Sequence, residues 1–166
     1  ILFTSYRAMD YVCEKLNGLS ALGYTVLKQG AMRREELMST FNSRPLAILL
    51  GVASYWEGID IPGEALSCVV LVKLPFSVPT DPIAQARNED IIKQGESPFA
   101  KYSLPRAILR LKQGFGRLIR TASDRGVVVV LDNRIQSKQY GRSFLKELPL
   151  AKVTKSFDDV RAHFDK

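Results

Sequence analysis

Cysteine, histidine and tryptophan are scarce in this sequence, and long apolar runs are missing from it. The 166 residues include two cysteines, one histidine and one tryptophan. Cys13 and Cys68 are too few for a disulfide framework or for a zinc or iron–sulfur site, so we expect no metal site in this chain. No stretch approaches the ~18 consecutive apolar residues of a membrane span, and residues 1–5 lack the basic leader of a signal peptide. We therefore expect a soluble, cytoplasmic protein without membrane contact.

The composition is that of one globular domain with a hydrophobic core. Hydrophobic residues make up 46% and charged residues 25% of the chain, which excludes disorder, collagen and coiled coil and indicates a single domain over residues 1–166. Twenty-four Lys and Arg against 17 Asp and Glu give a net charge of +7. This excess favours a polyanionic partner, but many basic domains bind none, so charge alone leaves the partner open. Because the chain opens on Ile1 and enters a strand at once, we expect a fragment of a longer protein.

Short apolar strands alternate with helices along the chain. Apolar, β-branched runs predict strands at 1–4, 24–27, 46–50, 68–74 and 126–132. Helical spacing and helix-start signals predict helices at 9–19, 33–41, 81–95, 105–122 and 141–147, followed by a polar tail. This alternation predicts an α/β fold with an open, mostly parallel sheet and helices on both faces. Because ligands lie at the carboxyl ends of the strands in such sheets, we expect the site at the segments after Leu50 and before Gly126.

The predicted helix from Pro105 to Ala122 concentrates arginine on one face. At about 100° per residue its opposite face is apolar, and the basic face holds Arg106, Arg110, Gln113, Arg117 and Arg120. The planar fork of arginine suits phosphate oxygens, so a row of arginines without carboxylate partners fits an anion. The alternative is a solvated face with carboxylate partners supplied elsewhere in the fold. Gly114 and Gly116 each cost about 1 kcal/mol relative to alanine inside a helix, which favours the close approach of a ligand or another backbone.

Several segments of the chain resemble helicase motifs. Gln113-Gly-Phe-Gly-Arg117-Leu-Ile-Arg120 resembles motif VI of superfamily 2 helicases, Gln-x-x-Gly-Arg-x-x-Arg. Ser54-Tyr-Trp-Glu-Gly-Ile-Asp60-Ile-Pro-Gly63 resembles motif V in the form of the XPD/DinG branch. Phe3-Thr4-Ser5-Tyr6 resembles the start of motif IV, and Leu74-Pro75-Phe76 with Asp81-Pro82 resembles the segment that follows motif V. The chain is similar to the second RecA-like motor domain of a DinG-like DNA helicase, nearer to bacterial DinG than to XPD, and this implies a RecA-like sheet.

Two motifs of such motors are missing from the sequence. It contains neither a Gly-x-x-x-x-Gly-Lys-Ser/Thr phosphate loop nor an Asp-Glu-Ala-His box. The resemblance implies that domain 1 of the same polypeptide supplies both and binds most of the ATP and Mg²⁺. We therefore expect the isolated chain to be inactive as an ATPase, and any iron–sulfur cluster to lie outside it.

The resemblance also implies roles in ATP hydrolysis for motif V and motif VI residues. Arg117 and Arg120 would meet the γ-phosphate as an arginine finger, and Gln113 would hydrogen-bond that phosphate or the attacking water. Gly116 would allow close approach to the nucleotide. Asp60 would accept a bond from a ribose hydroxyl, or alternatively only cap a turn. Glu57 would couple the cleft to DNA or pair with a motif VI arginine, and Gly58 is a contact or a permissive backbone position.

Single-stranded DNA is the expected partner, held through its phosphates by hydroxyls and basic side chains. The candidates for this contact are Thr4, Ser5, Arg7, Ser54 and Trp56. The hydroxyl residues could instead cap helices, and Trp56 could pack against a neighbouring helix rather than stack on a base.

Three functions remain open at this point. The first is half of an ATP-driven motor that translocates on single-stranded DNA and separates its strands. The second is a helicase-derived module that binds nucleic acid without taking part in hydrolysis. The third is a nucleotide-fuelled switch that offers its arginine to a partner protein. A bacterial, nucleoid-associated location and a role in DNA repair follow from the resemblance alone.

Overall fold

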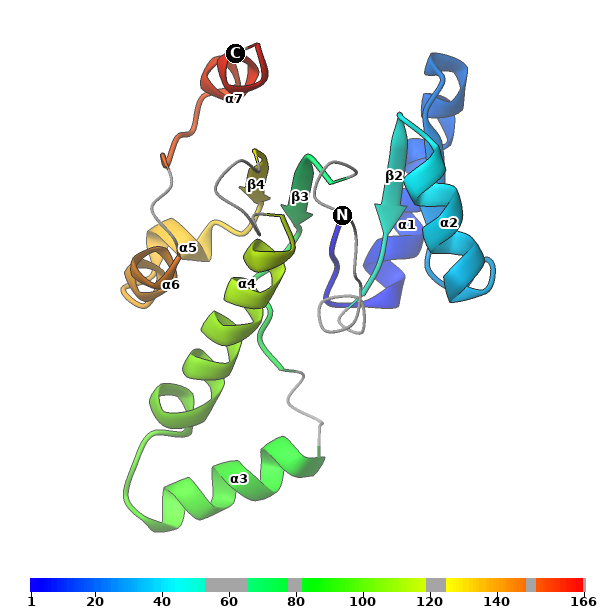
Figure 1. Ribbon diagram of the computed structural model, residues 1–166. Helices are drawn as coiled ribbons and strands as arrows, with labels where there is room; N and C mark the ends of the chain where they lie inside the picture. Colours follow the sequence, from blue (N-terminus) through cyan, green and yellow to red (C-terminus); the bar gives the residue numbers. More distant parts are fainter. Residues whose placement is uncertain (53–65, 78–81, 119–124, 149–151, 166) are drawn as a thin grey trace.

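The computed structural model describes residues 1–52, 66–77, 82–118, 125–148 and 152–165. For Arg117 it describes the backbone and not the side chain. Helices and short strands alternate along these segments (Figure 1). The helical elements are α1 (Tyr6–Leu16), η1 (Asn17–Leu22), α2 (Arg34–Ser43), α3 (Pro82–Lys93), the π-helical η4 (Phe99–Ser103), α4 (Leu104–Leu118), α5 (Arg134–Ser137), α6 (Gly141–Glu147) and α7 (Phe157–Phe164). The strands are β1 (Thr25–Lys28), β2 (Ala47–Leu50), β3 (Cys68–Leu71) and β4 (Val127–Val130).

The strands pair in parallel, and the amino-terminal segment joins the pairs. β1 pairs with β2, and β3 pairs with β4. Leu2 forms parallel bridges on both sides, to Gly51 after β2 and to Leu71 of β3. The amide of Leu2 donates to Val70 O at 2.7 Å, and that of Phe3 donates to Gly51 O at 2.8 Å. The expectation of a parallel α/β arrangement is confirmed for the described strands, although β2, β3 and β4 are shorter than predicted because each has only four paired residues.

Successive residues of β2 pack against different helices. Leu49 lies against the cluster built on Leu37 and Phe41 of α2, whereas Leu50 belongs to the cluster with Met9 of α1. Neighbouring strand residues point to opposite faces of a sheet, so α1 and α2 cover opposite faces of β2. A further cluster places α4 against β3, with Leu111 and Leu71 both fully buried. Helices therefore lie on both faces, as the sequence predicted.

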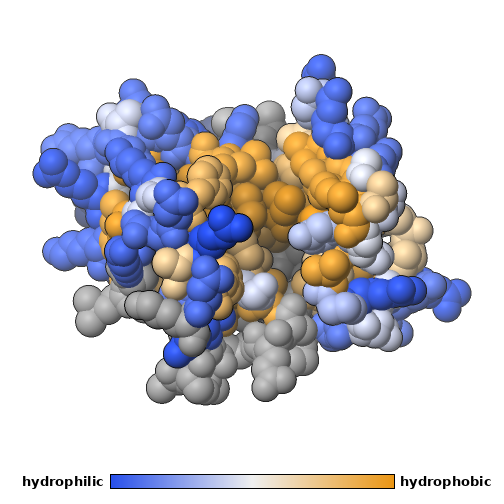
Figure 2. Space-filling view, turned by 90° about the horizontal axis from the view of Figure 1, so that it is seen from above, coloured by the Kyte–Doolittle hydropathy of each residue, from blue (hydrophilic) through white to orange (hydrophobic). Residues whose placement is uncertain are grey.

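The amino ends of the strands form an apolar edge. Figure 2 looks onto this edge, and apolar residues gather in the middle of that face between polar flanks. Leu22, Tyr24 and Leu46, which precede β1 and β2, are among the exposed large hydrophobic residues. The polar contacts described below lie at the opposite, carboxyl edge.

One helix was not predicted from the sequence, and one predicted helix end is confirmed. The polar tail, which was predicted without a helix, contains α7, whose amino end is capped by Ser156 accepting a bond from the Asp158 amide at 3.2 Å. Gly23 ends the first helical unit as predicted, because its φ of +83° lies in the left-handed region. Across the described segments, no helix has both the length and the apolar character needed to span a bilayer.

Candidate functional site

The start of α1 carries three of the predicted nucleic-acid contacts. Ser5 is the N-cap of this helix, and its Oγ accepts a hydrogen bond from the Ala8 amide at 3.3 Å. Thr4 beside it is half-buried, and Arg7 is exposed. The structure therefore brings Thr4, Ser5 and Arg7 together at the carboxyl edge of the sheet, since Phe3 is bonded to Gly51 directly after β2. It also shows that Ser5 has the capping role that was the alternative reading.

Gln29, which the sequence patterns did not single out, lies between this helix start and the end of β2. Its Oε1 accepts a hydrogen bond from the Val52 amide at 2.8 Å, and its Nε2 donates to Tyr6 Oη at 3.2 Å. The side chain thus joins the exits of two neighbouring strands to the first residue of α1. A lone glutamine after a strand gives no recognisable sequence signal, because its partners are distant in the chain.

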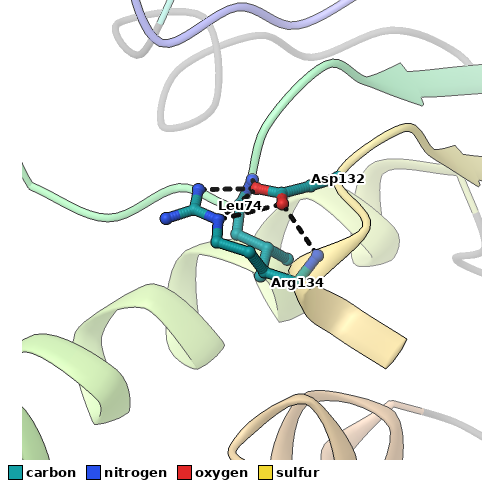
Figure 3. A network of polar contacts seen from close by, with 3 residues as sticks. All are labelled: Leu74, Asp132 and Arg134. Atoms are coloured by element: carbon teal, nitrogen blue, oxygen red, sulfur yellow. Dashed lines mark hydrogen bonds and ion pairs between the residues drawn. The ribbon is translucent and has the colours of Figure 1, made fainter. Parts of the chain in front are cut away.

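Asp132 is the most strongly bonded carboxylate at the exits of β3 and β4. It is only 8% exposed, and its Oδ2 accepts bonds from Arg134 Nη2 at 2.6 Å and from the Leu74 amide at 2.9 Å (Figure 3). Its Oδ1 accepts from Arg134 Nε at 2.9 Å and from the Arg134 amide at 3.0 Å. The hydrogen bonds from the Arg134 side chain, followed by those from the backbone, lower the pKa of this carboxyl from 3.8 to about 2.

Aromatic rings continue this network. The Arg134 guanidinium lies 5.5 Å from the centre of the Phe76 ring, which stacks on Phe99 at 5.8 Å. Tyr140 and Phe144 pack their edges against the same Phe76 ring. The segment after β3 is therefore held in place by one carboxylate and by the rings of Phe99 in η4, Tyr140 before α6 and Phe144 in α6. An Asp-x-Arg string directly after an apolar strand is the sequence signal that could have pointed to this network.

Some side chains on the polar face of α4 are exposed, and others contact neighbouring residues. Gln113 is exposed, whereas Arg110 is half-buried and its Nη1 donates to Ser77 Oγ at 3.1 Å. The Arg106 guanidinium lies 5.1 Å from the centre of the Tyr102 ring. Basic residues near this face have carboxylate partners: Lys101 pairs with Glu96 at 2.8 Å and Lys112 pairs with Glu147 at 3.2 Å. For these two lysines, the carboxylate partners come from elsewhere in the fold, as the alternative of a solvated face required.

The two ends of α4 lie at opposite edges of the sheet. The contact between Arg110 and Ser77 places its first half near the exit of β3. Its last residue, Leu118, lies against Gly126 at the entrance to β4, where an added Cβ would be 2.5 Å from Leu118 Cδ1. The segment before Gly126 was expected at the ligand site. Gly126 itself lies at the amino edge, because β4 is parallel to β3 and begins there, and residues 119–124 before it lie outside the described residues.

The model of the family described as "Helicase C-terminal domain" matches residues 1–151 of this chain. The chain belongs to the helicase C-terminal domain family. It is 41% identical over 160 residues to the ATP-dependent DNA helicase YoaA of Haemophilus influenzae, covering 96% of this chain and 25% of the relative. It is 42% identical over 161 residues to the 3'-5' exonuclease DinG of Bacillus subtilis, covering 95% of this chain and 17% of that protein.

A further relative is also named a helicase. The ATP-dependent helicase DinG of Mycobacterium tuberculosis is 37% identical over 161 residues, which cover 97% of this chain and 24% of the relative. The resemblance to DinG-like proteins that the sequence motifs indicated is thereby confirmed. The chain spans a quarter or less of the length of these relatives.

The helicase-family motifs fall only partly on described residues. Arg117 lies in the last turn of α4, and Gly116 before it faces open space, since nothing lies within 4 Å of an added Cβ. Outside the described residues lie Arg120, Asp60, Gly58, Glu57, Ser54 and Trp56. No cluster of three or more potential metal ligands occurs in the segments that the structure describes.

Proposed function

We propose that this chain is the second RecA-like motor domain, over residues 1–166, of an ATP-dependent DNA helicase of the bacterial DinG type. The observation that carries this proposal is the match to the helicase C-terminal domain family along residues 1–151, with residues 113–118 of motif VI on the amphipathic helix α4. Relatives named ATP-dependent DNA helicases support the same function. The polypeptide that carries this chain acts in the bacterial cytoplasm on nucleoid-associated DNA, including during repair.

In this proposal, motif VI serves ATP held mainly by domain 1 together with Mg²⁺. Negative charge develops on the γ-phosphate during transfer, so guanidinium groups from Arg117 and Arg120 stabilise the transition state. Gln113, whose side chain is exposed on α4, has an amide that can donate to a phosphate oxygen or orient water. Asp60, with Gly58 and Glu57 beside it, binds the ribose and links the nucleotide to motif VI.

Single-stranded DNA is held at the carboxyl edge of the sheet. Thr4, Ser5 and Arg7 lie there at the start of α1, and they offer hydroxyl and guanidinium donors for phosphate oxygens. The N-terminal end of a helix also favours negative charge, which adds to this attraction. Ser54 and Trp56 complete the contact, with Trp56 stacking on a base.

The function is tested by ATP turnover of the full polypeptide with and without single-stranded DNA. Turnover that rises with DNA supports the motor. Binding of DNA without any DNA-stimulated turnover would instead support the alternative, a helicase-derived nucleic-acid-binding module.

Gly116→Ala is expected to separate stability from activity. Alanine is favoured over glycine inside a helix by about 0.5–1 kcal/mol, and the open space at Gly116 accommodates a Cβ, so the variant should be slightly more stable. If the nucleotide approaches this backbone, DNA-stimulated turnover should fall roughly tenfold or more. Thermal unfolding and turnover are measured on the same preparation, and undiminished turnover would remove Gly116 from the site.

Ser5 substitutions are expected to separate capping from DNA contact. Ser5→Ala removes the N-cap of α1 and should cost about 1 kcal/mol of stability. Ser5→Asp keeps an N-cap acceptor and should preserve stability, but its negative charge should weaken DNA binding severalfold. Fluorescence anisotropy with a labelled oligonucleotide gives the dissociation constant, and equal DNA affinity of Ser5→Asp and wild type would leave Ser5 as a cap alone.

A further inference from the structure

One face of the β3–β4 pair carries apolar side chains that no helix of the described residues covers. On the other face, alternate residues of both strands, among them Leu71 and Val130, pack with Leu111 of α4. Neighbouring residues of a strand point to opposite faces of the sheet, so the residues in between face away from α4. We call these residues the β3–β4 patch: Cys68, Val70, Val127, Val129 and, directly after β4, Leu131.

The β3–β4 patch is open to solvent. Cys68 is exposed, Leu131 is 61% exposed, and the three valines are half-buried. The strand register places Cys68 beside Val127 and Val70 beside Val129, so the side chains form one continuous surface. None of them belongs to an apolar cluster of the described residues. A continuous apolar sheet face is unfavourable in water and marks a site where another element packs.

α7 carries an apolar stripe that also lacks a packing partner. Phe157, Val160 and Phe164 are spaced by three and four residues and so lie on one side of the helix, and we call them the α7 stripe. Phe157 is 87% and Phe164 49% exposed, and none of the three belongs to an apolar cluster of the described residues. A helix of eight residues is marginal in water by itself, because helices gain most of their stability by packing an apolar side. α7 therefore needs a surface to pack on.

Polar contacts hold α7 as a unit with the residues before it. Asp159 accepts bonds from Lys152 Nζ at 2.9 Å and from Thr154 Oγ1, and Ser156 caps the helix. At about 100° per residue, Asp159 lies on the side of the helix opposite to the α7 stripe. The unit can therefore dock through its stripe without breaking these contacts.

The chain is long enough to bring the two surfaces together. Leu148 after α6 packs against the cluster on the α4 side of the sheet, and residues 149–156 separate it from α7. Eight extended residues span at most about 26–29 Å. Passing from one helix layer to the opposite one crosses two layer distances of about 10 Å each. Among the described strands β4 pairs only with β3, so its outer edge lies open to this passage.

We propose that α7 docks its stripe on the β3–β4 patch and forms the helix layer that this half of the sheet lacks. The occupant is a segment of the same chain, because both surfaces are apolar and uncovered and a tether of sufficient length joins them. A phenylalanine ring buries about 150–250 Å², so the two rings suit a sheet face of valines. β3 and β4 lead into the bond between the Leu74 amide and Asp132, so the docked helix supports the strands that position this contact. Docking of α7 is independent of the nucleotide and DNA sites in the proposed function.

Cys68 in the β3–β4 patch is a native reporter of this docking. The full polypeptide that carries the chain is treated with iodoacetamide, and alkylation of Cys68 is followed over time by mass spectrometry of the peptide that contains it. The variants Phe157→Ser and Phe164→Ser each remove a ring from the α7 stripe. The matched control is Ile92→Ser, which removes a 62% exposed apolar side chain from α3. Cys13 on α1, which is half-buried, is the reference thiol in the same molecule.

Cys68 should react roughly tenfold or more slowly in the wild type than in Phe157→Ser, because a docked population of about 90% or more protects it by that factor. Ile92→Ser should react like the wild type, and Cys13 should react alike in all the proteins. Without docking, replacing the 87% exposed Phe157 changes nothing near Cys68. Equal rates for Cys68 in the wild type and in both stripe variants overturn the proposal, whether the shared rate is fast or slow.

A cross-link identifies the occupant of the β3–β4 patch. Val160→Cys places a second thiol in the α7 stripe, and a short bismaleimide joins it to Cys68 when both lie within its reach. Ala162→Cys, on the other side of α7, is the matched control and should cross-link severalfold less. A cross-link within one chain supports the proposal. A cross-link between two chains shows that a second copy covers the patch and overturns it, and so does the lack of any cross-link to Cys68.

Discussion

Replacing Arg120 with alanine in the full polypeptide is expected to lower DNA-stimulated ATP turnover by at least about 100-fold. The proposed finger acts on charge that develops only in the transition state, so kcat should fall much more than KM for ATP rises. Steady-state turnover at saturating single-stranded DNA gives both constants. Arg120→Lys should recover little of the activity, because lysine lacks the planar fork that meets two phosphate oxygens together.

The control for this experiment is Arg142→Ala, which removes an exposed arginine of α6 and should leave turnover unchanged. It corrects for the loss of one positive charge, which by itself weakens binding of a polyanion. Unchanged turnover in Arg120→Ala would exclude the finger assignment. The same measurement on Arg117→Ala then shows whether the other arginine of motif VI acts on the γ-phosphate.

Asp132→Ala is expected to lower the free energy of unfolding by about 2–4 kcal/mol. The substitution leaves the buried Leu74 amide without an acceptor and removes the carboxylate that orients Arg134. Urea denaturation followed by circular dichroism measures the change. Asp132→Asn keeps one acceptor oxygen and should lose less, and the control Asp90→Ala removes an exposed carboxylate bonded to Gln94 and should be nearly neutral.

The contribution of Asp132 to stability is expected to depend on pH in the acid range. Hydrogen bonds from Arg134 and the backbone lower the pKa of this carboxyl to about 2, so the folded state favours its charged form. Its stabilisation is therefore complete above the ordinary pKa of 3.8 and is lost as the pH falls toward 2. The stability difference between wild type and Asp132→Asn should shrink between roughly pH 4 and pH 2, and a difference independent of pH would contradict the lowered pKa.

Local patterns predicted much of the fold because they depend on near neighbours in the sequence. The apolar, β-branched run at 126–132 contains β4, and the helix predicted at 141–147 is α6 with the same bounds. The apolar side of the predicted arginine-rich helix is buried at Leu111 and Leu118, as its 3.6-residue period required. The sequence patterns did not predict α7, a helix of eight residues that buries little apolar surface, since Phe157 is 87% and Phe164 49% exposed.

Short motifs in the sequence predicted which residues belong to the candidate site. Residues 113–118 of motif VI lie on α4 as expected, and the motif IV residues Thr4 and Ser5 lie beside the exit of β2. Which edge of the sheet each motif occupies was not predictable from the motif alone. The direction of β4 places Gly126 at the amino edge, so Leu118, the last described residue of motif VI, lies away from the exit of β2.

The sequence by itself determined the family of this protein, because the family motifs depend on residue types at fixed spacing, and the same motifs are the basis of the proposed phosphate and DNA contacts. Only the tertiary structure decided that Gln29 joins Tyr6 to Val52 and that Asp132 holds Leu74. These bonds connect residues 23 and 58 positions apart, respectively. A hydrogen bond forms only where atoms approach to about 3 Å in a suitable direction, and folding alone creates that proximity between distant positions.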